Sequence, residues 1–277
     1  MSTLSVTLIQ SELHWEDVAA NLSMFEKKIA AVAGQTELVV LPEMFSTGFS
    51  MRPEMLAETM DGPTLEWMKK VAARNKVILT GSLIIKDDGR YFNRLIWMLP
   101  TGKFGVYDKR HRFAYAGEDE EYSAGTKRLI ASAKGWRINL QICYDLRFPV
   151  WARQQLHKET LTDGSLEYDV LIFVANWPER RINAWKSLLK ARAIENQCYV
   201  VAVNRVGADG NGIAYSGGST VIDPLGEVLY EKNEVEDTFT CDLQKQLLQD
   251  VRSKFPFWKD ADAFQILTGV EQSKLGL

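Results

Sequence analysis

The chain has 277 residues, of which 46% are hydrophobic and 25% are charged. This composition is typical of a soluble globular protein of one or two domains, whose core needs no disulfide bond or metal for stability. The 33 Lys and Arg residues nearly balance the 36 Asp and Glu residues, and the net charge is −3. Such a balance argues against nucleic acid or an anionic membrane surface as a partner.

The cysteines and the hydrophobic runs indicate the cellular compartment. Three widely spaced cysteines, Cys143, Cys198 and Cys241, favour reduced thiols over a disulfide framework. Residues 1–10 lack the basic stretch, apolar run and cleavage site of a secretory signal. The longest apolar runs, around residues 170–175 and 199–203, have the length of strands and fall far short of the roughly 18 residues that cross a bilayer. We therefore expect a cytoplasmic protein with free thiols and no membrane partner.

The first half of the chain alternates short strands with amphipathic helices. Alternating polarity predicts a strand over residues 4–10, and apolar residues at helical spacing predict a helix over 21–33. Further strands are predicted over residues 38–41, 77–83, 91–99 and 103–109, and a further helix over 65–75. Pro100-Thr101-Gly102 joins the last two of these strands as a hairpin.

The second half continues the alternation. Residues 137–143 alternate in polarity and predict a strand, whereas residues 170–175 are apolar throughout and predict a strand buried on both faces. A helix is predicted over 183–196, and two closing strands over 219–222 and 227–230 flank a turn that contains proline. No linker, repeat or low-complexity stretch interrupts the chain, so we expect a single domain.

Several common catalytic and binding motifs are missing from the sequence. There is no G-x-x-x-x-G-K-[ST] phosphate loop, no G-x-G-x-x-G dinucleotide motif and no G-x-S-x-G nucleophile turn. The histidines lie far apart, without the spacing of a zinc site. The sequence therefore disfavours nucleotide chemistry, a metal site and a serine hydrolase of the α/β-hydrolase type.

Three reactive side chains stand at the C-terminal ends of predicted strands: Glu43, Lys109 and Cys143. Because the carboxyl ends of strands border the binding crevice in α/β folds, a carboxylate, an ammonium and a thiol can converge there. Taken one at a time, such a cysteine is usually a small buried hydrophobic residue, and such a charge is usually solvated. Position alone therefore leaves their catalytic role open.

The residues around these side chains carry a family resemblance. The segments, in chain order, are Leu41-Pro42-Glu43-Met44-Phe45, Tyr107-Asp108-Lys109-Arg110-His111 and Cys143-Tyr144-Asp145-Leu146-Arg147-Phe148-Pro149. Together they resemble the nitrilase (carbon-nitrogen hydrolase) superfamily. The resemblance continues through Asn176-Trp177-Pro178 to Asp223-Pro224-Leu225-Gly226. It covers about residues 4–262 of the expected single domain, 1–277, and leaves a variable tail over 263–277.

The resemblance implies an α/β fold, a four-layer α-β-β-α sandwich that is usually dimeric or larger. It also implies a catalytic set with Cys143 as nucleophile, Glu43 as general base and Lys109 as stabilising cation. The chemistry suits these side chains, because a thiol is mostly protonated at neutral pH and needs a neighbouring base or cation to attack an amide. The Lys109 ammonium and the backbone N–H of Tyr144 can hold the oxyanion, and no metal or organic cofactor is required.

A second acid is expected in the acidic loop after Lys109. The family places a glutamate seven residues before the glycine of an aromatic-x-x-Gly element, here Tyr122-Ser123-Ala124-Gly125. That spacing selects Glu118, whose expected role is to orient Lys109 and the substrate nitrogen. The alternative is that Glu118 belongs to a solvated acidic loop.

Among the branches of the superfamily, Asn176-Trp177-Pro178 with Asp209-Gly210-Asn211-Gly212 resembles bacterial omega-amidases, which deamidate 2-oxoglutaramate and related dicarboxylate monoamides. The substrate is then a small amide with a carboxylate at its far end, and a guanidinium suits that carboxylate. The candidate guanidinium groups are those of Arg147, Arg180 and Arg181, each of which has a structural ion pair or a solvated loop charge as its alternative. The expected apolar walls are Phe45, Tyr144 and Trp177.

Three other interpretations stay open at this point. One is an amidase or N-carbamoyl hydrolase of different specificity within the same superfamily. A second is a non-catalytic domain that keeps the fold for partner binding, which intact Glu43, Lys109 and Cys143 disfavour. A third is a Cys-His hydrolase with His111 as base. We expect a homodimer or larger assembly, both from the family resemblance and from the apolar stripe of the helix over 183–196.

Overall fold

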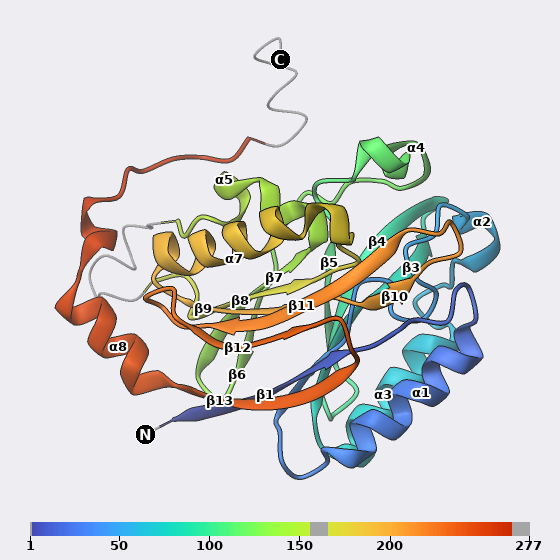
Figure 1. Ribbon diagram of the computed structural model, residues 1–277, viewed down its shortest axis with the longest axis horizontal. Helices are drawn as coiled ribbons and strands as arrows, with labels where there is room; N and C mark the ends of the chain where they lie inside the picture. The colour runs from blue at the N-terminus through green and yellow to red at the C-terminus, as the bar shows by residue number, and fades with distance from the viewer. Residues whose placement is uncertain (1, 156–165, 268–277) are drawn as a thin grey trace.

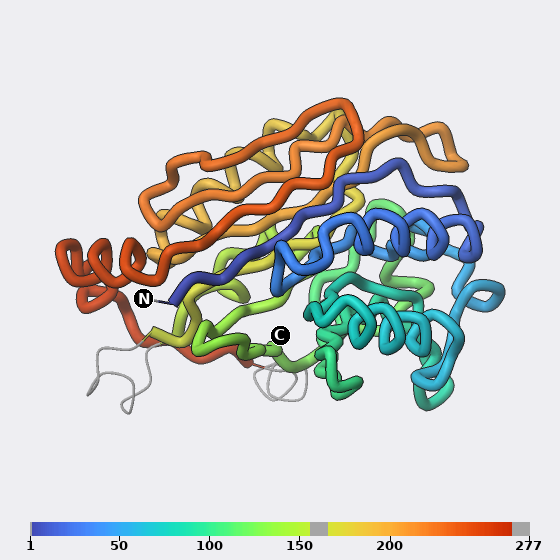
Figure 2. Tube along the Cα trace, turned by 90° about the horizontal axis from the view of Figure 1, so that it is seen from below, coloured from blue at the N-terminus to red at the C-terminus, as the bar shows by residue number. Residues whose placement is uncertain are grey.

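The computed structural model describes residues 2–155 and 166–267. Two β-sheets pack face to face, and helices cover the outer face of each sheet (Figures 1 and 2). The predicted four-layer α-β-β-α sandwich is therefore confirmed. Residues 268–277, most of the tail that the sequence sets apart, lie outside the described part of the chain.

The first sheet has the strand order β13-β1-β2-β3-β4-β5, in which β1, β2 and β3 run parallel and the other pairs are antiparallel. Its strands are β1 (Thr3–Gln10), β2 (Leu38–Val40), β3 (Ile78–Asp87), β4 (Arg90–Met98), β5 (Phe104–Asp108) and β13 (Asp237–Gln244). The helices α1 (Val18–Ala31) and α3 (Pro63–Asn75) cover its outer face (Figure 1). Phe25 and Ile29 of α1 pack there with Leu65 and Met68 of α3.

The second sheet has the order β10-β11-β9-β8-β7-β6, with β12 paired to β11. Its strands are β6 (Ile130–Ala133), β7 (Trp136–Ile142), β8 (Val170–Val174), β9 (Tyr199–Val203), β10 (Val206–Ala208), β11 (Ala214–Ile222) and β12 (Val228–Asn233). β7, β8 and β9 run parallel, so their carboxyl ends share one edge. The helix α7 (Ile182–Asn196) covers the outer face, with Trp185, Leu189 and Ala193 buried.

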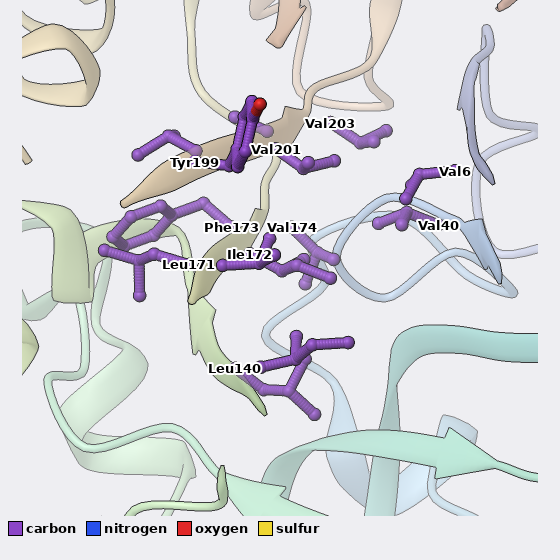
Figure 3. Packing of buried hydrophobic residues seen from close by; sticks show 14 of the residues in the cluster. Val6, Val40, Leu140, Leu171, Ile172, Phe173, Val174, Tyr199, Val201 and Val203 are labelled. Carbon is purple, nitrogen blue, oxygen red and sulfur yellow. The ribbon is translucent and has the colours of Figure 1, made fainter. Parts of the chain in front are cut away.

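The space between the sheets is filled by branched aliphatic side chains. Figure 3 shows Val6 and Val40 of the first sheet together with Val174 and Val203 of the second. All four are fully buried. Such β-branched residues suit both a pleated strand and a close-packed interior. The packed interface fixes the two sheets against each other and therefore fixes the loops that leave their edges.

The remaining helices are short or lie near the chain end. They are α2 (Pro53–Leu56), α4 (Glu118–Glu121), α5 (Pro149–Ala152) and α8 (Lys245–Lys254), with 3₁₀ turns at Ala114–Ala116, Cys143–Arg147, Glu179–Arg181 and Phe257–Asp260. None of the described helices is long and apolar enough to traverse a bilayer.

Three strands of the structure are not predicted from the sequence, and the apolar stripe of one helix has another explanation than the one expected. β6, β10 and β13 were not predicted; β13 alternates polar and apolar residues weakly, and its side chains are mostly half-buried because it lies at the sheet edge. The apolar stripe of α7 is one of the two grounds on which the sequence analysis predicts a second subunit. Its residues Trp185, Leu189 and Ala193 instead pack on the chain's own sheet, so the stripe needs no partner.

Candidate active site

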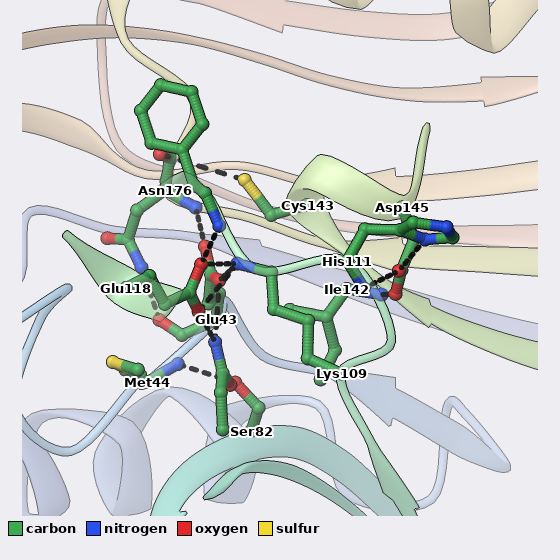
Figure 4. A network of polar contacts seen from close by, with 12 residues as sticks. Glu43, Met44, Ser82, Lys109, His111, Glu118, Ile142, Cys143, Asp145 and Asn176 are labelled. Carbon is green, nitrogen blue, oxygen red and sulfur yellow. Dashed lines mark hydrogen bonds and ion pairs between the residues drawn. The ribbon is translucent and has the colours of Figure 1, made fainter. Parts of the chain in front are cut away.

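Three strand ends deliver the predicted catalytic side chains to one place. Glu43 follows β2, Lys109 follows β5 and Cys143 follows β7, and Figure 4 shows them together. The Lys109 Nζ lies 2.8 Å from Glu43 Oε1, and it lies 2.9 Å and 2.8 Å from the two carboxylate oxygens of Glu118. All three charged side chains are at most 1% exposed. Glu118 is therefore part of the buried cluster and not of a solvated loop.

The two glutamates differ in how many donors they accept. A carboxylate has about four acceptor positions. Glu118 receives two contacts from Lys109, one from Asn93 Nδ2 at 3.1 Å and one from the N–H of Phe113 at 2.6 Å. Glu43 receives one from Lys109, one from Asn93 and one from the Asn176 N–H, the last at Oε2 over 2.8 Å. Glu43 thus keeps one acceptor position free to take a proton, whereas Glu118 is saturated.

The backbone is strained at Cys143 and at the residue that follows Glu43. Cys143 begins a 3₁₀ turn with φ of +42°, and Met44, which follows Glu43, has the same φ. Both values lie in the left-handed region that L residues with side chains seldom adopt, and such outliers cluster at functional sites. The N–H of Met44 donates to Ser82 Oγ at 2.8 Å, which secures the turn at Met44. The Cys143 Sγ lies 3.9 Å from the Asn176 carbonyl oxygen.

Burial and the neighbouring charges set the resting proton positions. Burial raises the pKa of the Cys143 thiol, the Glu43 carboxylate raises it further, and the Lys109 ammonium acts in the opposite direction. Burial alone would lower the pKa of Lys109, but the carboxylates of Glu118 and Glu43 outweigh it and raise that pKa. The resting site therefore holds a neutral thiol beside a charged ammonium.

The pKa of Glu118 is raised, first by burial and also by the charge of Glu43, while Lys109 acts to lower it. Two carboxyl groups therefore compete for one ammonium. An arrangement of this kind leaves negative charge in excess, which disfavours a thiolate in the free protein. A nucleophilic attack by this thiol would require a base, and Glu43 is the carboxylate of the cluster with a free acceptor position.

A cavity of about 110 Å³ opens onto Cys143. Most of its wall is apolar or aromatic, and two arginines and one aspartate supply its charges. Its lining residues are Phe49, Met51, Phe113, Ala116, Cys143, Tyr144, Arg147, Asn176, Trp177, Pro178, Arg181, Asp209, Asn211, Ile213 and Tyr215. A space of this size and character suits a small molecule with one charged end.

Comparison with known proteins decides the family. The family model described as carbon-nitrogen hydrolase matches residues 5–253 of this sequence. The chain belongs to the carbon-nitrogen hydrolase family. Omega-amidase YafV of Escherichia coli K12 is 41% identical over 267 residues, which span 96% of this chain and all of that protein. The 2-oxoglutaramate amidase of Bacillus subtilis is 31% identical and covers 92% of this chain and 96% of its own length.

A solved structure agrees with the assignment. The crystal structure of a CN-hydrolase superfamily protein from Xanthomonas campestris, which carries an arsenic adduct in its active site, matches with a TM-score of 0.93 and 45% identity. The match covers 96% of this chain and 100% of that chain. The chain is thus a carbon-nitrogen hydrolase in both sequence and fold.

The cavity of this carbon-nitrogen hydrolase contains most of the expected binding residues. Tyr144, Arg147, Trp177 and Arg181 all line it. The Arg147 guanidinium lies 5.0 Å from the ring of Trp177, and the Arg181 guanidinium lies 4.9 Å from the ring of Phe113. Within residues 2–155 and 166–267, neither guanidinium forms an ion pair.

Two of the proposed binding residues lie elsewhere. Arg180 is exposed and does not line the cavity. Phe45 was expected to form a wall, but its ring is fully buried behind the first sheet, 5.6 Å from Phe25 and 5.9 Å from Trp67. The turn at Met44 directs Phe45 away from the site, and Phe49 takes the place on the cavity wall.

Other functional residues were missed. Asn93 bridges the carboxylates of Glu43 and Glu118, and Asn176 donates its backbone N–H to Glu43. Asp209, Ile213 and Tyr215 of the β10–β11 hairpin close one side of the cavity. Asn93 and Tyr215 stand inside strands without any motif, so no sequence pattern indicates their role. Asn176 and Asp209 lie in the motifs that suggested the family branch, where they had no assigned role.

His111 does not fit the role of an alternative base. Its Nδ1 lies 2.8 Å from Asp145 Oδ1, and its ring stacks on Phe148 with centroids 3.8 Å apart. The ring is absent from the lining of the cavity. The side chains of Lys109 and His111 therefore serve different carboxylates, and the Cys-His interpretation loses its geometric basis.

Proposed function

We propose that this chain is an omega-amidase that hydrolyses the terminal amide of a short dicarboxylate monoamide, such as 2-oxoglutaramate, through a thioester on Cys143. The observation that carries the proposal is the composition of one small cavity. Cys143, beside the Glu43 and Lys109 pair, opens into it. The guanidinium groups of Arg147 and Arg181, which form no ion pair within the described part of the chain, line it. The names of the curated relatives support the same substrate class.

In the first step the Cys143 sulfur attacks the amide carbon while its proton passes to the free acceptor position of Glu43. This order follows from the raised pKa of the thiol, which keeps the proton in place until the base takes it. Negative charge then develops on the amide oxygen. The Lys109 ammonium and the Tyr144 N–H are the proposed donors to that oxygen. Lys109 makes two contacts with Glu118, so it can turn one N–H towards the oxyanion without losing this carboxylate.

In the second step the tetrahedral intermediate collapses. The carbon-nitrogen bond breaks, Glu43 returns its proton to the nitrogen, and ammonia leaves a thioester on Cys143. Glu43, again a carboxylate, then takes a proton from water, which attacks the thioester carbon. The carbon-sulfur bond breaks, Glu43 returns this proton to the departing Cys143 sulfur, and the acid is released. One carboxylate thus serves both half-reactions as base and acid.

The charged end of the substrate is the second half of the proposal. A carboxylate in a cavity with little water needs a cation or several N–H donors. Asp209, the acidic residue of the wall, is already occupied by the N–H groups of Asn211 and Ile213 and by the hydroxyl of Tyr215. Arg147 and Arg181 are therefore the charged groups of the wall that have no ion-pair partner among the described residues. Their planar guanidinium groups can bind a carboxylate through two hydrogen bonds.

The test is ammonia release from a panel of amides, nitriles and N-carbamoyl compounds. The deciding pair is a dicarboxylate monoamide of four or five carbons and an uncharged aliphatic amide of the same length. We expect kcat/KM to favour the charged amide by about tenfold or more, the value of one charge-assisted hydrogen bond. Equal turnover of both amides would remove the omega-amidase assignment and leave the thioester mechanism. Turnover of N-carbamoyl compounds alone would point to the alternative specificity.

We further predict a single domain, a cytoplasmic location and a homodimer or larger assembly. The last now rests on the family resemblance alone, since α7 packs on its own sheet. Sedimentation at micromolar concentration distinguishes an assembly from a monomer of 31.4 kDa.

A further inference from the structure

A third buried carboxylate lies next to the reacting cluster and has no part in the mechanism above. Asp145 is fully buried and makes four hydrogen-bonding contacts. Its Oδ1 receives the backbone N–H of His111 at 2.9 Å and faces the Nδ1 of the same residue at 2.8 Å. Its Oδ2 receives the hydroxyl of Tyr107 at 2.6 Å and the N–H of Ile142 at 3.1 Å. Figure 4 shows Asp145, His111 and Ile142 beside the cluster.

The direction of the tyrosine hydrogen bond follows from its other neighbours. Trp151 Nε1 donates to the Tyr107 oxygen at 2.9 Å, and the Arg110 N–H donates to it at 3.3 Å. Since that oxygen already accepts two bonds, its own hydrogen must point to Asp145. At least three of the four contacts therefore come from fixed donors. Only a carboxylate, which has acceptors alone, can receive all of these donors. An amide in its place would turn its own N–H group towards one of the donors.

The contacts of Asp145 join two strand ends. On one side its carboxylate holds the N–H of Ile142, the residue before Cys143, and so closes the strained turn of the nucleophile. On the other side it holds positions 107 and 111, which bracket Lys109. Among the described side chains, no other single carboxylate contacts β5, the segment after Lys109 and the turn of Cys143. Asp145 therefore cross-links the two strand ends beside Lys109 and Cys143, the pair that must meet the substrate.

We infer that Asp145 is a positioning residue, whose carboxylate fixes the distance and direction between the Cys143 thiol and the Lys109 ammonium. A misplacement of about 1 Å in such a pair can reduce the rate by about 100-fold. His111, which the sequence offers as a rival base, belongs to this cross-link. The inference rests on the proposed roles of Cys143 and Lys109, and it adds a residue that touches neither substrate nor reacting atoms.

The test compares Asp145→Asn with Asp169→Asn. Asp169 is a matched control, because it is also buried and holds the Arg137 N–H, Lys245 and Arg252 near the other end of the second sheet. Folding is followed by circular dichroism, and Cys143 is titrated with iodoacetamide so that kcat is given per reactive thiol. We expect Asp145→Asn to lower kcat by about 10- to 100-fold with KM changed less than about threefold. Asp169→Asn is expected to lower the melting temperature and leave kcat unchanged.

A graded series guards against misfolding of the first variant. Tyr107→Phe removes one donor and His111→Leu removes another, and both keep the carboxylate. Each is expected to lower kcat by less than Asp145→Asn does, again with little effect on KM. Wild-type kcat in folded Asp145→Asn, or in both milder variants if it does not fold, would overturn the inference, as would an equal loss of kcat in Asp169→Asn. Failure of the wild type to hydrolyse dicarboxylate monoamides would instead remove the proposed function.

Discussion

Two buried cysteines of the second sheet show what separates a nucleophile from a core thiol. Cys143 follows β7 and Cys198 precedes β9, and burial raises the pKa of both. Each also has charged neighbours of both signs. Near Cys198, Arg252 lowers the pKa and Asp169 raises it, whereas near Cys143 the carboxylate of Glu43 raises it and Lys109 lowers it.

The difference lies in access and in the surplus of charge. Cys198 is fully buried, and the charges that act on it are balanced, with Arg252 and Arg153 opposing Asp169 and Glu195. Cys143 opens into the cavity and stands beside two carboxylates that share one ammonium. A perturbed thiol is therefore not a sufficient sign of catalysis. An accessible sulfur and a base with a free acceptor position complete the requirement.

Replacing each thiol in turn gives the largest expected contrast. Cys143→Ala should lower ammonia release by roughly 10⁴-fold or more, because no other side chain can form the thioester. Cys198→Ala should keep wild-type kcat and lose stability through a small cavity, by about 1 kcal/mol. Steady-state ammonia release and thermal unfolding measure both. Activity in Cys143→Ala, or its loss in folded Cys198→Ala, would reverse the comparison.

Glu43→Gln separates thiol acidity from turnover. The variant removes the base, so kcat should fall by about 10²- to 10⁴-fold. It also removes a charge that raises the pKa of Cys143, so that pKa should fall as Lys109 acts with less opposition. Iodoacetamide alkylation of Cys143 should then reach its half-maximal rate at a lower pH than in the wild type, with Cys143→Ala as the blank. An unchanged or higher midpoint would show that the Glu43 charge does not act on the thiol.

Glu118→Gln tests whether the saturated glutamate acts through Lys109. It replaces an acceptor of four donors by an amide, so the ammonium loses one anchor but the base stays. We expect kcat to fall by about 100-fold, less than in Glu43→Gln, with the alkylation midpoint shifted less. A loss of kcat larger than that of Glu43→Gln would assign the base to Glu118.

The smallest expected effect concerns the charged end of the substrate. Arg147→Met and Arg181→Met neutralise the two cavity arginines, and Arg180→Met is the matched control outside the cavity. At least one of the first two should raise KM for a dicarboxylate monoamide by roughly tenfold to 100-fold, the value of hydrogen bonds to a charge, and leave kcat nearly unchanged. The KM for an uncharged amide should not move in any of the three. Unchanged KM values throughout would mean that backbone donors hold the carboxylate.

The sequence predicts the central strands from local hydrophobic patterns, and the family resemblance of its strand-end motifs implies the layers and the catalytic cluster. Alternating or wholly apolar runs placed most central strands within a few residues of β1, β7 and β8, and the strand-end motifs gave Glu43, Lys109 and Cys143. The spacing that selected Glu118 over its acidic neighbours also identified a residue of the buried cluster. In each case a few adjacent residues determine the outcome.

The features that escaped prediction depend on contacts between distant segments. β13 pairs with β1 across more than 200 residues, and its own sequence is half polar. Phe45 lies next to a motif residue, yet the turn at Met44 directs its ring into the opposite layer. Tyr107 of β5 and His111 after it make three of the four contacts to Asp145, so only the folded chain brings these groups to the carboxylate.

The central claim, hydrolysis through a covalent Cys143 thioester, can be tested directly by acid-quenching the wild type during turnover of a dicarboxylate monoamide. Peptide mass spectrometry should then find the acyl group on Cys143, with Cys198 and Cys241 unmodified. Hydroxylamine treatment should release the group, since it cleaves thioesters. Steady ammonia release without an acyl group on Cys143, or with one on another cysteine, would contradict the account.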